Sequence, residues 1–191
     1  MYPSREEAEK ILIEAESCNP GPWGDHSRVA AGCAEKIAML CEDIDSSKAY
    51  VLGLLHDIGR KFGTRHLGHV YDGYQYMLRL GYDEVAQICL THSFCNHDLK
   101  NFIGNLDINK EKQGEVEKAL EESVFDDYDR LIQLCDCLAG ANSVLDMVER
   151  MEDVKQRYGN YPQDKWIMNL GLKTYFEDKT GKNLYEIVDL K

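Results

Sequence analysis

The segment from Ala49 to Ile58 constrains the fold more than any other, because its apolar residues would extend around most of the surface of a helix. A helix that is apolar on most sides must be buried, and only neighbouring elements that pack against it can bury it. Two ionisable residues, His56 and Asp57, stand near its end, where burial is costly unless each finds a partner. The segment therefore predicts a central helix that carries a polar site.

Apolar residues recur at three- and four-residue steps in most of the remaining chain, as at Val29, Cys33 and Ile37, which is typical of helices. We expect Ser4, in a capping box with Glu7, to start the first helix, and Ser46 and Asp83 to cap two later ones. No segment alternates as a strand does, so an all-α fold is predicted. The expected helices cover residues 4–16, 25–41, 46–57, 67–80, 83–92, 111–123, 128–138, 144–158 and 163–177.

The composition narrows the function and the compartment. With 34 acidic and 22 basic residues, the net charge is −12, which disfavours binding to duplex nucleic acid. No apolar run approaches the ~20 residues that span a bilayer, so no membrane association is expected. Seven cysteines without a Cys-x-x-Cys pair indicate reduced thiols. We expect one domain over residues 1–191, cytoplasmic, monomeric or homodimeric, with a small-molecule partner.

Two His-Asp dipeptides occur, and their contexts separate them. His56-Asp57 ends the apolar helix, whereas His97-Asp98 lies in a polar loop and is expected to be solvated. Buried imidazole and carboxylate groups from separate helices can satisfy one another by binding a common cation in the core. His26, in the first turn of a helix, and Asp136, within the apolar run 131–138, complete such a set.

These residues give the chain a resemblance to the HD superfamily of metal-dependent phosphohydrolases, whose signature is H...HD...D on a helical bundle. The resemblance covers about residues 23–145 and includes the run Gly-Leu-Leu-His-Asp-Ile-Gly-Arg at 53–60. It implies an HD-domain bundle with its metal in the core, held by His26, His56, Asp57 and Asp136. The helices of residues 146–191 would pack on this core.

His69 and His92 are similar to the additional histidines of HD proteins that bind a second metal or contact substrate phosphate. The segment His-Val-Tyr-Asp-Gly at 69–73 resembles HD-type symmetrical diadenosine tetraphosphate hydrolases, although Ser93-Phe94 departs from their pattern. His66 is a weaker candidate for such a role.

The resemblance implies a hydrolase that acts on a small phosphorylated molecule, expected to be a nucleotide. Mixed nitrogen and oxygen ligands favour one or two transition-metal ions, iron or manganese first, with zinc, cobalt, nickel and magnesium as alternatives. The metal would activate water as hydroxide beside Asp57. The expected phosphate-binding cations are Arg60, Lys61 and Arg65, of which the first two would also be catalytic, and Trp23 would stack on a base.

Two other functions remain open at this stage. The same ligand types serve HD-type di-iron oxygenases, and an HD domain can also bind a nucleotide for regulation without turning it over. Oxygen uptake and colour would distinguish the first from a hydrolase.

Overall fold

The computed structural model describes residues 1–190, and within them it contains only helices, turns and loops. The predicted all-α fold is confirmed, and a single β-bridge joins Ala139 to Val144. Two short 3-10 helices, η1 (Ile58–Phe62) and η2 (Leu99–Asn101), interrupt the chain. The α-helices of the described residues are α1 (Arg5–Cys18), α2 (Trp23–Ala38), α3 (Ser46–Leu55), α4 (Leu67–Arg79), α5 (Asp83–Thr91), α6 (Lys110–Glu122), α7 (Asp127–Leu138), α8 (Met147–Tyr158), α9 (Gln163–Thr180) and α10 (Leu184–Ile187).

Several helix starts differ from the prediction in their capping groups. Ser4 accepts a hydrogen bond from the Glu7 amide as expected, but the Glu7 carboxylate accepts one from Tyr82 rather than turning back to Ser4. The side chain of Asp45, not the serine that follows it, caps α3. Asp83 lies inside α5, and its carboxylate binds the amino terminus of the chain. Short polar side chains compete for these positions, and tertiary contacts select among them.

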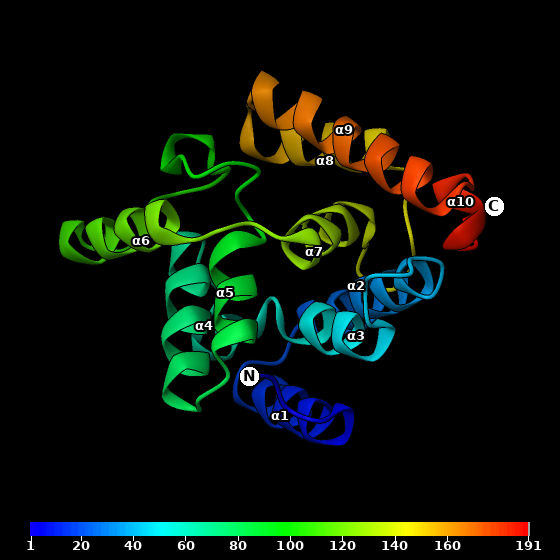
Figure 1. Cartoon of the computed structure of the whole chain (residues 1–191). Helices are drawn as coiled ribbons and strands as arrows, with labels where there is room; N and C mark the ends of the chain where they lie inside the picture. Colours follow the sequence, from blue (N-terminus) through cyan, green and yellow to red (C-terminus); the bar gives the residue numbers. More distant parts are fainter. Residues whose placement is uncertain (191) are drawn as a thin grey trace.

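The pair α2 and α3 packs against α7, which lies near the middle of the view, and α1 lies below the pair (Figure 1). The two helices approach closely because small residues meet where they cross. A Cβ atom on Gly53 would lie 2.9 Å from the Cα of Ala31, so only glycine permits this distance. The predicted burial of the Ala49–Ile58 segment is confirmed by this arrangement.

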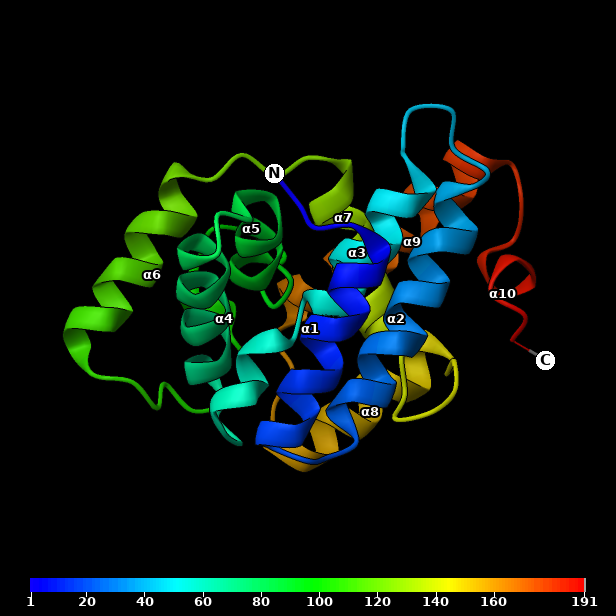
Figure 2. The ribbon, with the colours of Figure 1, turned by 90° about the horizontal axis from the view of Figure 1, so that it is seen from below.

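Within residues 1–190, the core consists of two hydrophobic clusters. The larger joins α1, α2, α3 and α7, and it includes Met147, Met151 and Phe176 from the C-terminal helices. The smaller lies among α4, α5 and α6, where Val116 and Leu120 anchor α6. In both views α6 occupies the outer edge (Figures 1 and 2). The C-terminal helices therefore share the main core with the motif-bearing ones, while α6 packs only on the α4–α5 side.

The sequence predicts no segment that spans a membrane. In residues 1–190, no helix combines the length and the apolar character that crossing a membrane requires.

Candidate metal centre

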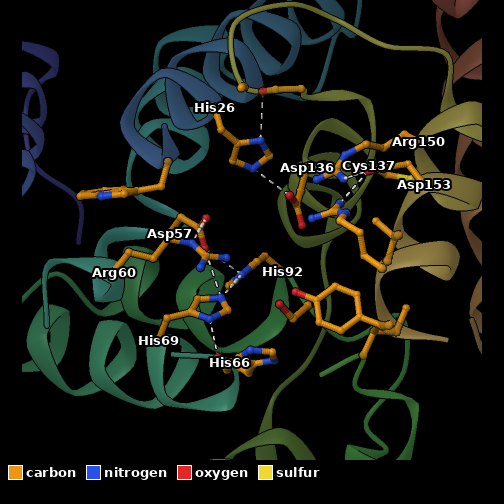
Figure 3. Close-up of a pocket in the computed structure, with 18 of the residues that line it drawn as sticks. His26, Asp57, Arg60, His66, His69, His92, Asp136, Cys137, Arg150 and Asp153 are labelled. Carbon is orange, nitrogen blue, oxygen red and sulfur yellow. Dashed lines mark hydrogen bonds and ion pairs between the residues drawn. The ribbon is translucent and has the colours of Figure 1, made fainter. Parts of the chain in front are cut away.

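A cavity of about 730 Å³ opens between the α4–α5 pair and the α8–α9 pair (Figure 3). Most of the predicted ligands reach it, since His26, Asp57, His69, His92 and Asp136 line its wall. The imidazole of His56 is only 1% exposed and packs behind this layer, with its ring centroid 5.3 Å from that of His26. The volume falls in the range of small-molecule sites.

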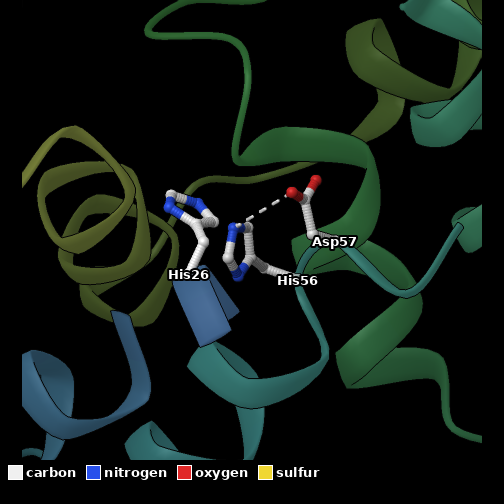
Figure 4. Close-up of side chains that lie close together, drawn as sticks. All are labelled: His26, His56 and Asp57. Atoms are coloured by element: carbon white, nitrogen blue, oxygen red, sulfur yellow. Dashed lines mark ion pairs between the residues drawn. The ribbon is translucent and has the colours of Figure 1, made fainter. Parts of the chain in front are cut away.

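A first set of ligand atoms belongs to His26, His56 and Asp57, and these atoms all lie within 4.8 Å of one another. His26 comes from the first turn of α2, and His56 is the residue that ends α3 (Figure 4). Asp136 of α7 lies beside this set, with its Oδ1 atom 3.0 Å from the Nε2 of His26 and 3.8 Å from that of His56. The four residues predicted from distant segments are thus brought together.

A second set consists of Asp57, His69 and His92. The Nε2 atoms of His69 and His92 lie 3.1 and 3.6 Å from the Oδ1 atom of Asp57. His69 comes from the first turn of α4, and His92 ends α5. Asp57 belongs to both sets, so its carboxylate stands between two groups of imidazoles.

The backbone fixes how these imidazoles are turned. In each of the four histidines the Nδ1 atom faces a main-chain carbonyl oxygen, which accepts its proton. These bonds join His26 to Ala139 at 3.1 Å, His56 to Gly53 at 2.7 Å, His92 to Cys89 at 3.0 Å, and His69 to His66. With the proton on Nδ1, each Nε2 presents a lone pair to the neighbouring ligand candidates, as in metal-bound histidines.

The two sets have the chemistry that a transition-metal ion requires. The Nε2 of His56 and the Oδ1 of Asp57 are buried without a hydrogen-bond partner, and the Nε2 atoms of His69 and His92 face each other at 3.2 Å. Buried acceptors that face one another repel unless a cation lies among them. Adjacent ligands of an octahedral ion with bonds of about 2.1 Å lie about 3 Å apart. The residues therefore fit one or two such ions.

Electrostatics favours the ligating forms of Asp57 and His92. Burial would raise the pKa of Asp57, but the positive charge of Arg60, together with the contacts of the carboxylate with His69 and His56, outweighs it and holds that pKa well below the ordinary value. Burial and the neighbouring His56 lower the pKa of His92 to about 3. An ionised carboxylate and a neutral imidazole are the forms that bind metal.

The sequence model of the HD domain family matches residues 23–141, which is more than half of the chain and contains all six ligand candidates. The chain belongs to the HD domain family. A search of the curated proteins and a search of the solved structures found no match. The predicted HD-domain bundle is therefore confirmed by the family match and by the helical fold together.

The second ligand set of this HD domain depends on a close contact between η1 and α4. A Cβ atom on Gly59 would lie 1.9 Å from the carbonyl oxygen of His69 and 2.5 Å from the amide nitrogen of Gly73. Only a residue without a side chain lets η1 approach α4 this closely. The glycine after the His-Asp pair thus helps to bring His69 to Asp57.

The three cations that were predicted to bind phosphate lie in different environments. Arg60 lines the cavity, and its Nε donates to Asp57. Arg65 also lines it and pairs with Asp72. Lys61 does not line the cavity, because the 3-10 turn of η1 directs its ammonium to Glu14, at 2.9 Å, and to the hydroxyl of a tyrosine. The expected catalytic and phosphate-binding roles of Lys61 therefore have no support in this arrangement.

Two further predictions concern Trp23 and the second His-Asp pair, His97-Asp98. Trp23 lines the cavity, and its indole donates to the carbonyl of Asn19 at 2.8 Å. His97 and Asp98 are exposed, as the loop reading predicted. His97 faces the carbonyl of Ser123, and Asp98 caps η2.

Some residues at this site were not predicted. Arg150 and Arg157 of α8 and Lys165 of α9 line the cavity, and so does His66, which the sequence indicated only as a weaker candidate. Local sequence gave no signal for the three cations, because α8 and α9 have the charged faces that surface helices usually have. Only the packing of these helices over the ligands turns those cations inward.

Proposed function

We propose that this HD domain is a metal-dependent phosphohydrolase that acts on a small phosphorylated molecule, expected to be a nucleotide. The observation that supports it most is one cavity in which two ligand sets share Asp57 and cationic side chains surround them. Five cationic side chains and three carboxylates line that cavity, although the whole chain has a net charge of −12. Two of the carboxylates, Asp57 and Asp136, would be neutralised by a metal, which leaves a site suited to an anion.

The residues have separate tasks in this proposal. His26, His56, Asp57 and Asp136 would hold one ion, and His69 and His92 would hold a second with Asp57. A divalent transition metal supplies a Lewis acid that lowers the pKa of water toward roughly 7 and polarises a phosphoryl oxygen. Asp57, kept ionised by its neighbours, can accept a hydrogen bond from the attacking water and orient it.

Arg60 is the cation that we assign to the transferred phosphoryl group. Its Nε is held by the Asp57 carboxylate, which fixes the guanidinium beside the ligand sets. Its backbone carbonyl accepts a hydrogen bond from the side chain of Asn19 at 2.6 Å, which anchors the turn. Charge grows on the phosphoryl oxygens in the transition state, and a stationary cation there lowers the barrier.

The expectation of a nucleotide rests on the aromatic part of the cavity. Trp23, Tyr158 and Tyr161 line it, and flat rings of this kind can stack on a base. The seven cysteines are all unpaired, which fits the reducing compartment in which a cytoplasmic enzyme would work.

The test is a panel of phosphomonoesters, phosphodiesters and nucleotides incubated with protein reconstituted with iron or manganese. We expect phosphate or nucleotide release by the wild type, with loss of at least about a hundredfold in His56→Ala, because a buried ligand is removed. His97→Ala is the matched control, since it changes the histidine of the other, exposed His-Asp pair, and it should keep wild-type turnover. Equal turnover by His56→Ala would rule out the proposal. Oxygen uptake without phosphate release would favour the di-iron oxygenase.

A further inference from the structure

The α8–α9 pair lies outside residues 23–141, which the family model matches, yet it forms one wall of the cavity. Figure 3 shows Arg150 and Asp153 of α8 on the side of the cavity where Asp136 lies. Arg157 of the same helix and Lys165 of α9 add two more cations to this wall. The two helices outside the matched region, α8 and α9, therefore bring positive charge to the cavity.

Lys165 is the least satisfied of these cations. Its ammonium donates to the carbonyl oxygen of Ser93 at 2.7 Å, and within residues 1–190 it forms no ion pair with a carboxylate. Burial in the cavity wall lowers its pKa. Lys165 is half-buried, and a partly desolvated ammonium that keeps its charge is stabilised when an anion neutralises it and its remaining protons find acceptors. The position of Lys165 is thus explained by an anion that enters the cavity.

The two arginines of α8 add to this charge because they share one partner. The carboxylate of Asp153 lies 3.4 Å from a guanidinium nitrogen of Arg150 and 2.8 Å from one of Arg157. One negative charge between two guanidinium groups leaves an excess of one positive charge. Asp153 also restrains both side chains, so they are held at the wall before a ligand arrives.

His66 also lines the cavity, where it meets Tyr158 of α8, and it differs from the four ligand histidines. Its Nδ1 accepts a hydrogen bond from the amide of Asn105 at 3.0 Å, so its proton is on Nε2. The ring packs edge-on against Tyr158, with 5.6 Å between the centroids. His66 is therefore a hydrogen-bond donor at this wall, whereas the ligand histidines present lone pairs.

We propose that Lys165, Arg150, Arg157 and His66 form a second anion subsite, which we call the α8–α9 subsite. The preferred substrate then carries at least two phosphoryl groups, one at the metal ligands and another at this wall. This inference deepens the proposed function, on which it rests for the reaction but not for binding. A substrate with a single phosphate would leave Lys165 without a counter-charge.

Calorimetric titration of the manganese-loaded protein tests the α8–α9 subsite without relying on turnover. The probes are AMP and α,β-methylene ADP, which share a base and differ in one phosphoryl group. We expect the diphosphate analogue to bind more tightly to the wild type. Lys165→Met should weaken its binding roughly tenfold to a hundredfold, as the loss of a charged hydrogen bond predicts, and should change AMP binding less than about threefold. Released phosphate and metal content are measured after each titration.

Lys173→Met is the matched control, because Lys173 lies on the same helix and pairs with Glu177 outside the cavity. It should leave both affinities unchanged, and Lys165→Arg should retain most of the diphosphate binding. If Lys165→Met melts early, Arg157→Met replaces it with the same expectation. An equal loss for both probes, no loss, or no wild-type preference for the diphosphate would overturn the subsite. Selective loss of diphosphate binding in a protein that hydrolyses nothing would support the subsite and refute the hydrolase.

Discussion

Asp57 is the residue on which both ligand sets depend, because its Oδ1 faces His69 and His92 while Arg60 holds its Oδ2. Asp57 is only 3% exposed, so its carboxylate is enclosed by the two ligand sets and Arg60. Arg60 then has two tasks, since it orients Asp57 and offers positive charge to the cavity. Its neighbour Lys61 has neither, although the sequence places the two cations side by side.

The first prediction compares these neighbours. Arg60→Met should lower kcat/KM about a hundredfold, because the transition state loses a fixed cation, whereas Lys61→Met should stay within about twofold of wild type. Steady-state kinetics on whichever substrate the panel identifies would measure both. Comparable losses in the two variants would mean that the ammonium of Lys61 does reach the phosphate, against the geometry described above.

At the scale of elements, the four ligand histidines of the candidate metal centre stand at the starts or the ends of helices. His56 and His92 follow the last residues of α3 and α5, and His26 and His69 stand in first turns. The last turns of helices leave carbonyl groups without intrahelical partners, and carbonyls of this kind in α3 and α5 accept the Nδ1 protons of His56 and His92. The 3-10 helix η1 connects the end of α3 to the start of α4, and its contact with α4 depends on Gly59.

The second prediction concerns that contact. Gly59→Ala would place a methyl group against the backbone of α4, which should cost about 1–3 kcal/mol of unfolding free energy and reduce metal binding by the second set. Thermal melts and metal analysis would show it. Gly171→Ala is the control, because no atom lies within 4 Å of its added Cβ, and it should stabilise α9 by up to about 1 kcal/mol. Full metal content in Gly59→Ala would contradict the role assigned to this glycine.

The third prediction concerns the junction of α7 with α9. Asp127 binds Lys179, Tyr175 and Arg130. Burial would raise the pKa of this carboxyl, but these partners outweigh it and lower the pKa below 3.8. A carboxyl whose pKa is lower in the folded state than in the unfolded state stabilises the fold at any pH above its unfolded pKa. This contribution is lost as the pH falls through the folded pKa.

Asp127→Asn should therefore destabilise the protein by about 1 kcal/mol at neutral pH, and the difference should shrink once the pH falls below 3.8. Chemical denaturation at a series of pH values would measure it. Asp178→Asn, an exposed change on α9, serves as the charge-matched control. A difference between Asp127→Asn and wild type that stays constant with pH would refute the assignment.

At the scale of the whole molecule, the chain has a negative net charge, whereas the α8–α9 wall of the cavity carries positive charge. The net charge of −12 repels polyanions at long range, while the wall of α8 and α9 attracts anions that have entered. The chain buries a continuous main core that reaches from α1 to α10, so it does not need a metal in order to fold. Binding of metal should therefore add to a stability that already exists.

The fourth prediction concerns the stability that metal binding adds. Removing metal with a chelator should leave the helical content intact but lower the Tm, and manganese at about one hundred times its Kd should stabilise by about 2.7 kcal/mol, or roughly 5–10 °C for a chain of this size. Circular dichroism melts would record both. His56→Ala should lose most of this shift. Identical melts with and without manganese would argue against a metal centre.

Much of the fold and half of the site could be predicted from local patterns. The periodicity predicted every α-helix except α10, which has only four residues and is too short to show a period. His26, His56, Asp57 and Asp136 could be found because ionisable residues among hydrophobic ones need partners. Lys61 was misplaced because no helix was expected between residues 57 and 67, whereas the chain forms the 3-10 helix η1 there, which directs consecutive side chains to different sides.

By itself, the sequence determined the helices and the ligand residues, since both follow from which side chains leave water along a short stretch of chain. The tertiary structure decided what surrounds the ligands. Lys165 and Arg157 are separated from His56 by more than one hundred residues, and nothing in α8 or α9 marks them as different from surface cations. They became part of the site only because these helices pack on α7, and a contact between distant segments is a property of the whole packed core.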